Sequence, residues 1–91
     1  MIRLYKFKNF EIYGYKNVYI IYNKNKEFEN GHTHINNFKT AKYLIKLSYY
    51  KIIPKHLSSY LFKSLVRISN DELYLQKLNQ NKNKIISKKS Q

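Results

Sequence analysis

The chain reads Val18-Tyr19-Ile20-Ile21-Tyr22 at its most strongly strand-forming stretch, where every residue is β-branched or aromatic. Before it, Phe10-Glu11-Ile12-Tyr13 has the composition of a strand, and residues 14–17 have the residue types of a turn. After it, residues 23–26 are a polar turn, and Glu27-Phe28-Glu29 is a candidate for a short edge strand. The spacing predicts an antiparallel meander of three or four strands.

The beginning of the chain also alternates in the manner of a strand. The alternation places Ile2 and Leu4 on one face and Tyr5 and Phe7 on the other. Lys8-Asn9 then forms a tight connection to the next strand.

Beyond residue 36 the apolar period changes from 2 to about 3.6, which predicts helices. Asn36 or Asn37 is the expected N-cap of a first helix. Its buried stripe comprises Phe38, Ala41, Leu44, Ile45, Tyr49 and Ile52. Pro54 fits the first turn of a second helix, and the short break at 52–54 leaves a helix-turn-helix as an alternative arrangement.

The second helix is expected to end near Ser69, which has the capping-box spacing to Glu72. A third, short helix then runs to about Leu78. Residues 79–91 are polar and basic. We therefore expect a single compact basic domain over residues 1–78 and a basic flexible tail over residues 79–91.

Together these elements predict an α+β fold. An N-terminal antiparallel meander of three to four strands is followed by two or three helices packed on one face. The expected core consists of Leu4, Ile12, Val18, Ile20, Phe38, Ala41, Ile45, Leu57, Leu61, Leu65 and Ile68.

The 91 residues include 18 basic and 5 acidic side chains, which give a net charge of +13. Lysine, asparagine, isoleucine and tyrosine, whose codons are AT-rich, together supply 48 residues, so nucleotide composition accounts for part of the lysine excess. Such a bias is typical of a phage or mobile-element gene. Residues 30–70, however, contain seven basic residues and no carboxylate, which favours a polyanionic or acidic partner.

The cations of this stretch are interleaved with tyrosines at helical spacing. The first predicted helix carries Lys39, Lys42, Tyr43, Lys46 and Tyr50 on its solvent side. The second carries His56, Tyr60, Lys63 and Arg67. We expect these nine residues to form one exposed flank; the competing interpretation is that they only solvate two amphipathic helices.

Lysine and arginine displace counterions from a phosphate backbone, and tyrosine rings stack on unpaired bases. Arg67 has the planar fork that suits phosphate or guanine. The sequence therefore favours a small, non-enzymatic, cytoplasmic DNA- or RNA-binding protein whose partner is nucleic acid or a nucleoprotein complex. The alternative is a phage inhibitor of a host defence nuclease, similar in kind to anti-CRISPR proteins, that binds an acidic protein surface or guide RNA.

His32 and His34 are weak candidates for metal ligands, because alternate residues of an extended segment point the same way. Glu27 or Glu29 would be the third ligand in a metal-dependent nuclease, whereas an ordinary surface loop is the commoner role for such a pair. The chain has no cysteine and two glycines, so thiolate sites and a glycine-rich phosphate loop are excluded. We expect no catalytic residues, no cofactor and no membrane-spanning segment.

Overall fold

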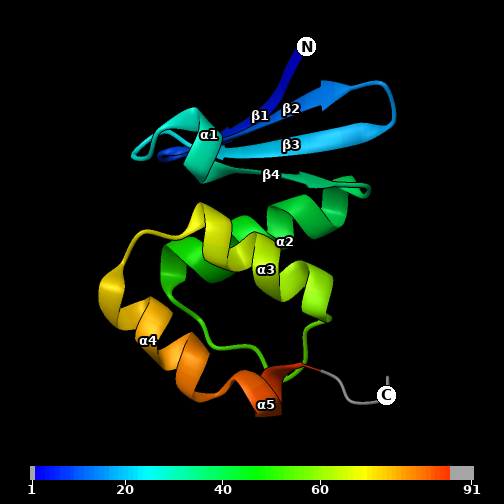
Figure 1. The fold of residues 1–91 in the computed structure, drawn as a ribbon. Coiled ribbons are helices and arrows are strands. Elements are labelled where there is room, and N and C mark those ends of the chain that lie inside the picture. The colour runs from blue at the N-terminus through cyan, green and yellow to red at the C-terminus, as the bar shows by residue number, and fades with distance from the viewer. Residues whose placement is uncertain (1, 87–91) are drawn as a thin grey trace.

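The computed structural model describes residues 2–86 (Figure 1). Its strands are β1 (Ile2–Phe7), β2 (Phe10–Tyr15), β3 (Val18–Asn23) and β4 (His32–Ile35). Its helices are α1 (Phe28–Gly31), α2 (Phe38–Tyr50), α3 (Ser59–Ile68), α4 (Glu72–Gln80) and α5 (Lys82–Ile85). The strands pair antiparallel in the order β1-β2-β3-β4, which confirms the α+β fold with an N-terminal meander.

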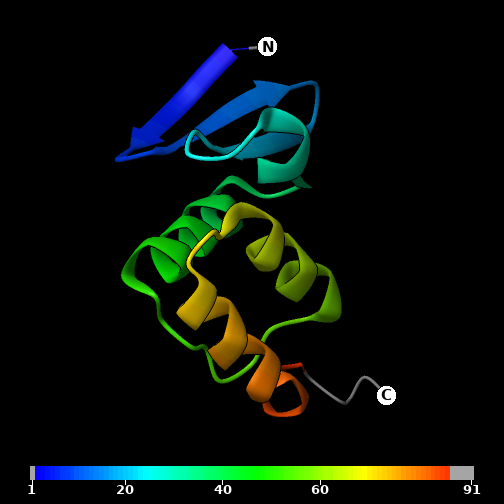
Figure 2. The ribbon, with the colours of Figure 1, turned by 60° about the vertical axis from the view of Figure 1, so that its left-hand side comes forward.

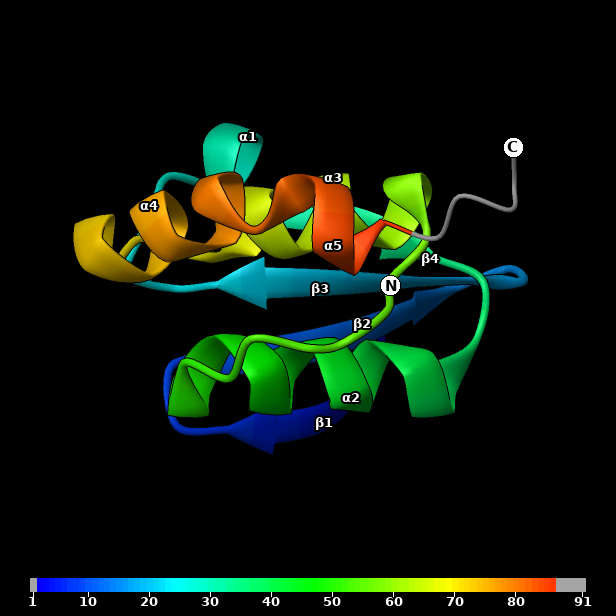
Figure 3. The same cartoon turned by 90° about the horizontal axis from the view of Figure 1, so that it is seen from below.

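The two longest helices share one face of the sheet, with α2 on the β1 side and α3 on the β4 side (Figure 3). Figure 2 shows α4 and α5 beyond these helices, farther from the sheet. The core forms where the apolar stripes of the helices meet the sheet, and it includes Ile12, Ile21, Leu44 and Leu65, all fully buried. Burial of each such aliphatic side chain stabilises the fold by roughly 1.5–3 kcal/mol relative to exposure.

β1 contains a bulge at Leu4, which changes the faces that its side chains occupy. Arg3 pairs with Tyr13 but Tyr5 pairs with Ile12, so one extra residue stands in β1. Tyr5 and Phe7 pair in regular register with Ile12 and Phe10, so they lie on the helix-facing side, where they pack against the core. The prediction that Leu4 belongs to the core was wrong, because the face of Tyr5 and Phe7 meets the helices, and Leu4 remains about half exposed.

The two tight connections of the meander turn at lysines. Lys8 and Lys16 both have φ of 57°, in the left-handed region that few non-glycine residues adopt. Gly14, predicted to open the second turn, instead stays within β2. A Cβ atom on Gly14 would lie 2.8 Å from the Leu4 side chain, so glycine is needed for Leu4 to lie close over the strand.

The segment after β3 forms the single turn of α1 and not the predicted edge strand at residues 27–29. The backbone N–H groups of Asn30 and Gly31 donate to the Glu27 carbonyl at 3.0 and 2.8 Å, which closes this turn. The fourth strand is the following segment, in which Thr33 and Ile35 are buried. β4 is one edge of the sheet, and α3 is the helix on that side (Figure 3).

Helix caps were predicted with mixed success. The Asn37 side chain accepts a hydrogen bond from the Thr40 N–H at 2.9 Å, which confirms it as the N-cap of α2. The N-cap of α4 is Asp71, which accepts from the Tyr74 N–H at 2.9 Å, and not Ser69. Ser69 is instead the buried C-cap of α3, where its hydroxyl donates to a carbonyl of the last helical turn.

The second helix begins later than predicted. Pro54 does not start it; residues 51–58 form a connection, and Ser58 caps α3 by accepting from the Leu61 N–H at 3.1 Å. Pro54 and Leu57 are buried within this connection. It is longer than the three- or four-residue turn of a helix-turn-helix, so α2 and α3 do not form that motif.

The folded body extends beyond the predicted domain boundary. α4 continues to Gln80, and α5 returns the chain to the 51–58 connection, where the Leu57 N–H donates to the Ile85 carbonyl at 2.6 Å. The Ile85 side chain is 1% exposed. Residues 79–86 are therefore part of the fold, because Ile85 reaches the core and Ile86 packs against it. Residues 87–91 of the predicted tail lie outside the described residues.

The core differs from the prediction at its margins. Val18, Phe38 and Leu61 are only partly buried. The core also includes residues that were not predicted: Phe10, Ile21, Ile35, Leu47, Phe62, Tyr74 and Ile85. Ile20 and Ile21 are adjacent in β3 and both are buried, so alternation alone could not identify the inner face there.

Substituting Ile85→Ala is expected to lower the free energy of unfolding by about 2–5 kcal/mol, because it removes a fully buried aliphatic side chain. Urea denaturation of the two proteins measures the difference. Leu73→Ala, at a side chain that is 70% exposed, is the matched control and should change stability by less than about 0.5 kcal/mol. Equal effects of the two substitutions would show that residues 79–86 behave as a tail.

Candidate nucleic-acid interface

Three lysines of α2 enclose a groove together with a tyrosine of β1. The groove has a volume of about 350 Å³, and it is lined by Tyr5, Lys39, Lys42, Tyr43 and Lys46. The α2 residues meet because their spacing of i, i+3, i+4 and i+7 puts them on one helical face. Tyr5 reaches the same place from the helix-facing side of β1, where it pairs with Ile12 of β2. The predicted basic ridge of α2 is therefore one wall of a concave surface.

Lys42 is held beside this groove by aromatic rings. Its Nζ atom lies 5.5 Å from the centroid of the Tyr5 ring and 5.0 Å from that of Phe38. The Tyr5 and Phe38 rings contact each other edge to face with centroids 6.2 Å apart. Cation–π contacts of this kind contribute about 0.5–1 kcal/mol at exposed sites, so they orient the ammonium group without neutralising it.

The contacts between β1 and α2 continue toward the C-terminal end of the helix. Phe7 packs on Tyr49 with ring centroids 5.2 Å apart and on Tyr50 at 6.2 Å. Lys8 Nζ lies 5.9 Å from the ring centroids of both Phe7 and Tyr49. We name the whole surface the β1–α2 seam and define it by Tyr5, Lys8, Lys39, Lys42, Tyr43, Lys46 and Tyr50.

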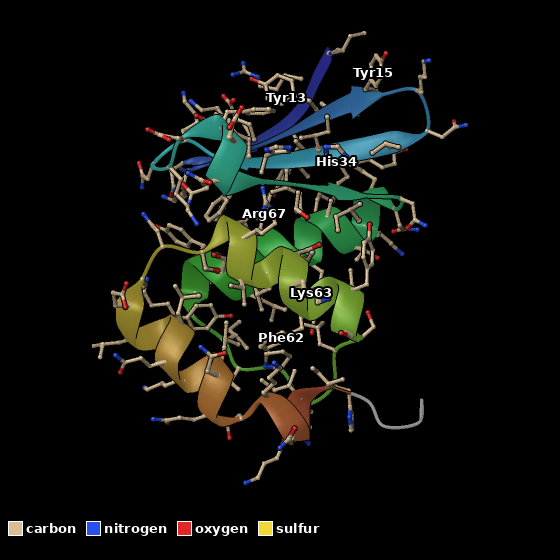
Figure 4. The ribbon with its side chains drawn as sticks, viewed as in Figure 1. Tyr13, Tyr15, His34, Phe62, Lys63 and Arg67 are labelled. Atoms are coloured by element: carbon tan, nitrogen blue, oxygen red, sulfur yellow. The ribbon has the colours of Figure 1, made fainter. Side chains whose placement is uncertain are left out.

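The predicted residues of α3 lie on the opposite flank. Arg67 Nε donates to the His32 carbonyl at 2.9 Å and Nη2 donates to the Glu29 carbonyl at 2.6 Å, while the Tyr60 hydroxyl donates to the His34 carbonyl. These acceptors lie on or next to β4, at the other edge of the sheet from β1 (Figure 4). The expectation of one common flank was wrong, because α2 and α3 lie on one sheet face and turn their outer sides to opposite edges.

Tyr60 and Arg67 therefore have structural partners. They donate to carbonyl groups of the edge strand β4 and of α1. These carbonyl groups have no neighbouring strand to pair with. Lys63 is exposed on the same flank, and His56 is exposed in the 51–58 connection, outside α3. The structure thus brings together the five predicted residues of α2 and separates them from the four predicted residues that follow.

Glu11 is the one buried carboxylate of residues 2–86, and it lies on the sheet face turned away from α2. It accepts hydrogen bonds from the Tyr13 hydroxyl at 2.7 Å and from Arg3 at 3.0 Å, and Lys24 Nζ lies 3.7 Å away. The Tyr13 hydrogen bond lowers the pKa of Glu11 below its ordinary value; burial opposes this shift, and Arg3 and Lys24 reinforce it.

The remaining ion pair of residues 2–86 joins Lys51 to Asp71 at 3.9 Å. Within this part of the chain, no lysine of the β1–α2 seam has a carboxylate within salt-bridge distance. Their positive charge is therefore available to an external anion.

The histidine pair lies on β4. The His32 and His34 ring centroids are 5.2 Å apart, and His32 stacks on Phe28 at 4.1 Å. Residues 2–86 contain no group of three His, Cys, Asp or Glu side chains that could hold a metal ion, so neither Glu27 nor Glu29 completes a site there. The pair packs with an aromatic neighbour at the edge of the sheet.

Sequence reasoning missed two contributors to the seam. Tyr5 was assigned to a strand face without a partner, and Lys8 was assigned only to a turn. The sequence does contain a pattern that points to Tyr5 and Lys8, because lysines alternate with aromatic residues in Tyr5-Lys6-Phe7-Lys8. Their proximity to α2, however, depends on the position of β1 beside that helix, which neither residue pattern predicts.

Comparisons with protein-family models, with curated proteins and with solved structures find no match to this chain. None of the helices in residues 2–86 is long and apolar enough to cross a membrane.

Substituting Arg67→Ala is expected to lower stability by about 1–2 kcal/mol, because it removes two charged hydrogen bonds that hold α1 and β4 to α3. Amide hydrogen exchange in α1 should accelerate at the same time. Lys63→Ala, one turn earlier on the same flank, should leave stability and exchange unchanged. Unchanged exchange in Arg67→Ala would contradict the structural role.

The lowered pKa of Glu11 predicts a pH-dependent contribution to stability. Since the folded state holds the carboxylate in its charged form, the contribution is fully present above the ordinary glutamate pKa and is lost as pH falls through the lower folded value. Denaturation between about pH 3 and 7 should show a smaller acid-induced loss for Glu11→Gln than for the wild type. Glu29→Gln, at an exposed carboxylate, should keep the wild-type profile, and an unaltered profile in Glu11→Gln would refute the assignment.

Proposed function

We propose that this protein is a non-enzymatic nucleic-acid-binding protein and that the β1–α2 seam is its binding surface. The observation that carries this proposal is the groove in which Lys39, Lys42 and Lys46 stand beside two tyrosine rings. Phosphate groups would supply the anions that these ammonium groups lack among residues 2–86.

Electrostatics supply most of the affinity in this proposal. Each lysine that neutralises a phosphate releases condensed counterions, so the logarithm of the binding constant falls linearly with the logarithm of the salt concentration. The three groove lysines predict a slope of about −2 for a single strand and about −3 for a duplex. Cations on the β4 flank contribute little, because they face away from the ligand.

The alternative partner is an acidic protein surface, as in an inhibitor of a nuclease, and it would use the same lysines. The two proposals differ in what purified protein binds by itself. Tight binding to a candidate nuclease complex without any binding to bare DNA or RNA would favour the inhibitor.

Substituting Lys46→Ala should weaken binding to all DNA and RNA sequences alike and reduce the magnitude of the salt slope by about 1. Fluorescence anisotropy with a labelled oligonucleotide, measured from about 50 to 200 mM salt, gives the slope.

Lys63→Ala is the matched control, because it removes the same charge from an exposed helical position on the opposite flank. It should leave the slope unchanged. A flat salt profile of the wild type would refute nucleic-acid binding, and equal effects of the two substitutions would refute the assignment of the surface.

A further inference from the structure

β1 and α2 together are too wide to enter a groove of duplex nucleic acid. An α-helix with its side chains is about 10–12 Å across and alone fills a DNA major groove of about 12 Å. Tyr5 of β1 stands against the exposed lysines of α2, so the strand would have to enter together with the helix. Direct reading of duplex bases by α2 is therefore sterically blocked.

Two exposed tyrosine rings belong to the β1–α2 seam, and one of them lines the groove. Tyr43 is 46% exposed and Tyr50 is 58% exposed, although both are large aromatic side chains. Tyr43 lines the groove together with Tyr5 and the three lysines. A duplex hides the faces of its bases in the stack, whereas an unpaired base offers a face to a tyrosine ring.

The size of the groove fits one such base. Its volume of about 350 Å³ falls within the range of roughly 300–1,000 Å³ that holds small ligands. Along α2, from Lys39 to Tyr50, the seam extends for about 16 Å at 1.5 Å per residue. At the axial rise of about 3.4 Å per nucleotide of a stacked strand, this length corresponds to at most roughly five nucleotides.

From this geometry we infer that the β1–α2 seam binds single-stranded nucleic acid, with an unpaired base stacked at Tyr43 in the groove and its neighbouring phosphates on Lys39, Lys42 and Lys46. The inference rests on the proposed function and specifies the class of its ligand. DNA and RNA single strands share the chemistry that the seam recognises, and the experiment separates them.

The test measures binding of labelled single-stranded DNA, single-stranded RNA and duplex DNA, each of 12 nucleotides or base pairs, by the wild type and by Tyr43→Leu. Loss of one stacked base should weaken single-strand binding by about 5- to 100-fold. Duplex binding, which uses only the lysines, should change by less than about twofold. Tyr43→Phe keeps the ring and should retain single-strand affinity.

Tyr15→Leu is the matched control. Tyr15 is 52% exposed and has Lys16 Nζ 5.4 Å from its ring centroid, but it ends β2 on the same sheet face as Tyr13, turned away from the helices (Figure 4). This substitution should not change affinity for any ligand. Circular dichroism of each variant verifies that the fold is retained.

A series of oligothymidylates gives a second measurement, in which affinity should cease to rise steeply beyond about five nucleotides. Equal affinity of the wild type for single strand and duplex, or equal loss of both in Tyr43→Leu, would overturn the inference and leave the salt-dependent function standing. Absence of salt-dependent binding to all three ligands would overturn the proposed function itself.

Discussion

Two helices share one face of a four-stranded sheet, and this constraint determines where the cations of the protein lie. Each helix directs its apolar stripe toward the sheet and the other helix, so the outer side of α2 turns toward β1 and that of α3 toward β4. These two edges are three strand spacings apart, or roughly 14 Å. This separation exceeds the Debye length of about 8 Å at physiological ionic strength, so the two groups of cations act as separate surfaces.

The same residue types serve different purposes at the two edges. At β4, Tyr60 and Arg67 donate to backbone carbonyls and hold α1 and the edge strand to α3. At β1, Lys42 and Tyr43 have no backbone partner of this kind within residues 2–86 and line a groove. A bulge and exposed cations also make the β1 edge a poor template for another strand.

The sequence was sufficient to predict an N-cap at Asn36 or Asn37, the buried residues Ala41, Leu44 and Ile45 and the lysines of the outer side of α2. Ile52, which was predicted to continue the buried stripe, lies beyond α2 and is exposed. The partners of that outer side could not be predicted, because they come from β1, and neither residue pattern shows that β1 lies beside α2. Pro54 misled the assignment of α3, because proline suits a buried connection as well as a first helical turn. Arg67 misled the assignment of the interface, because its spacing is the same whether its guanidinium group meets phosphates or, as here, two backbone carbonyls.

The most direct test of the central claim is a nuclear magnetic resonance titration of the protein with a short single-stranded oligonucleotide. The account predicts that chemical shifts change at Tyr5, Lys39, Lys42, Tyr43 and Lys46 and stay constant around Lys63 and Arg67. Changes centred on α3 and β4, or spread evenly over both edges of the sheet, would contradict it.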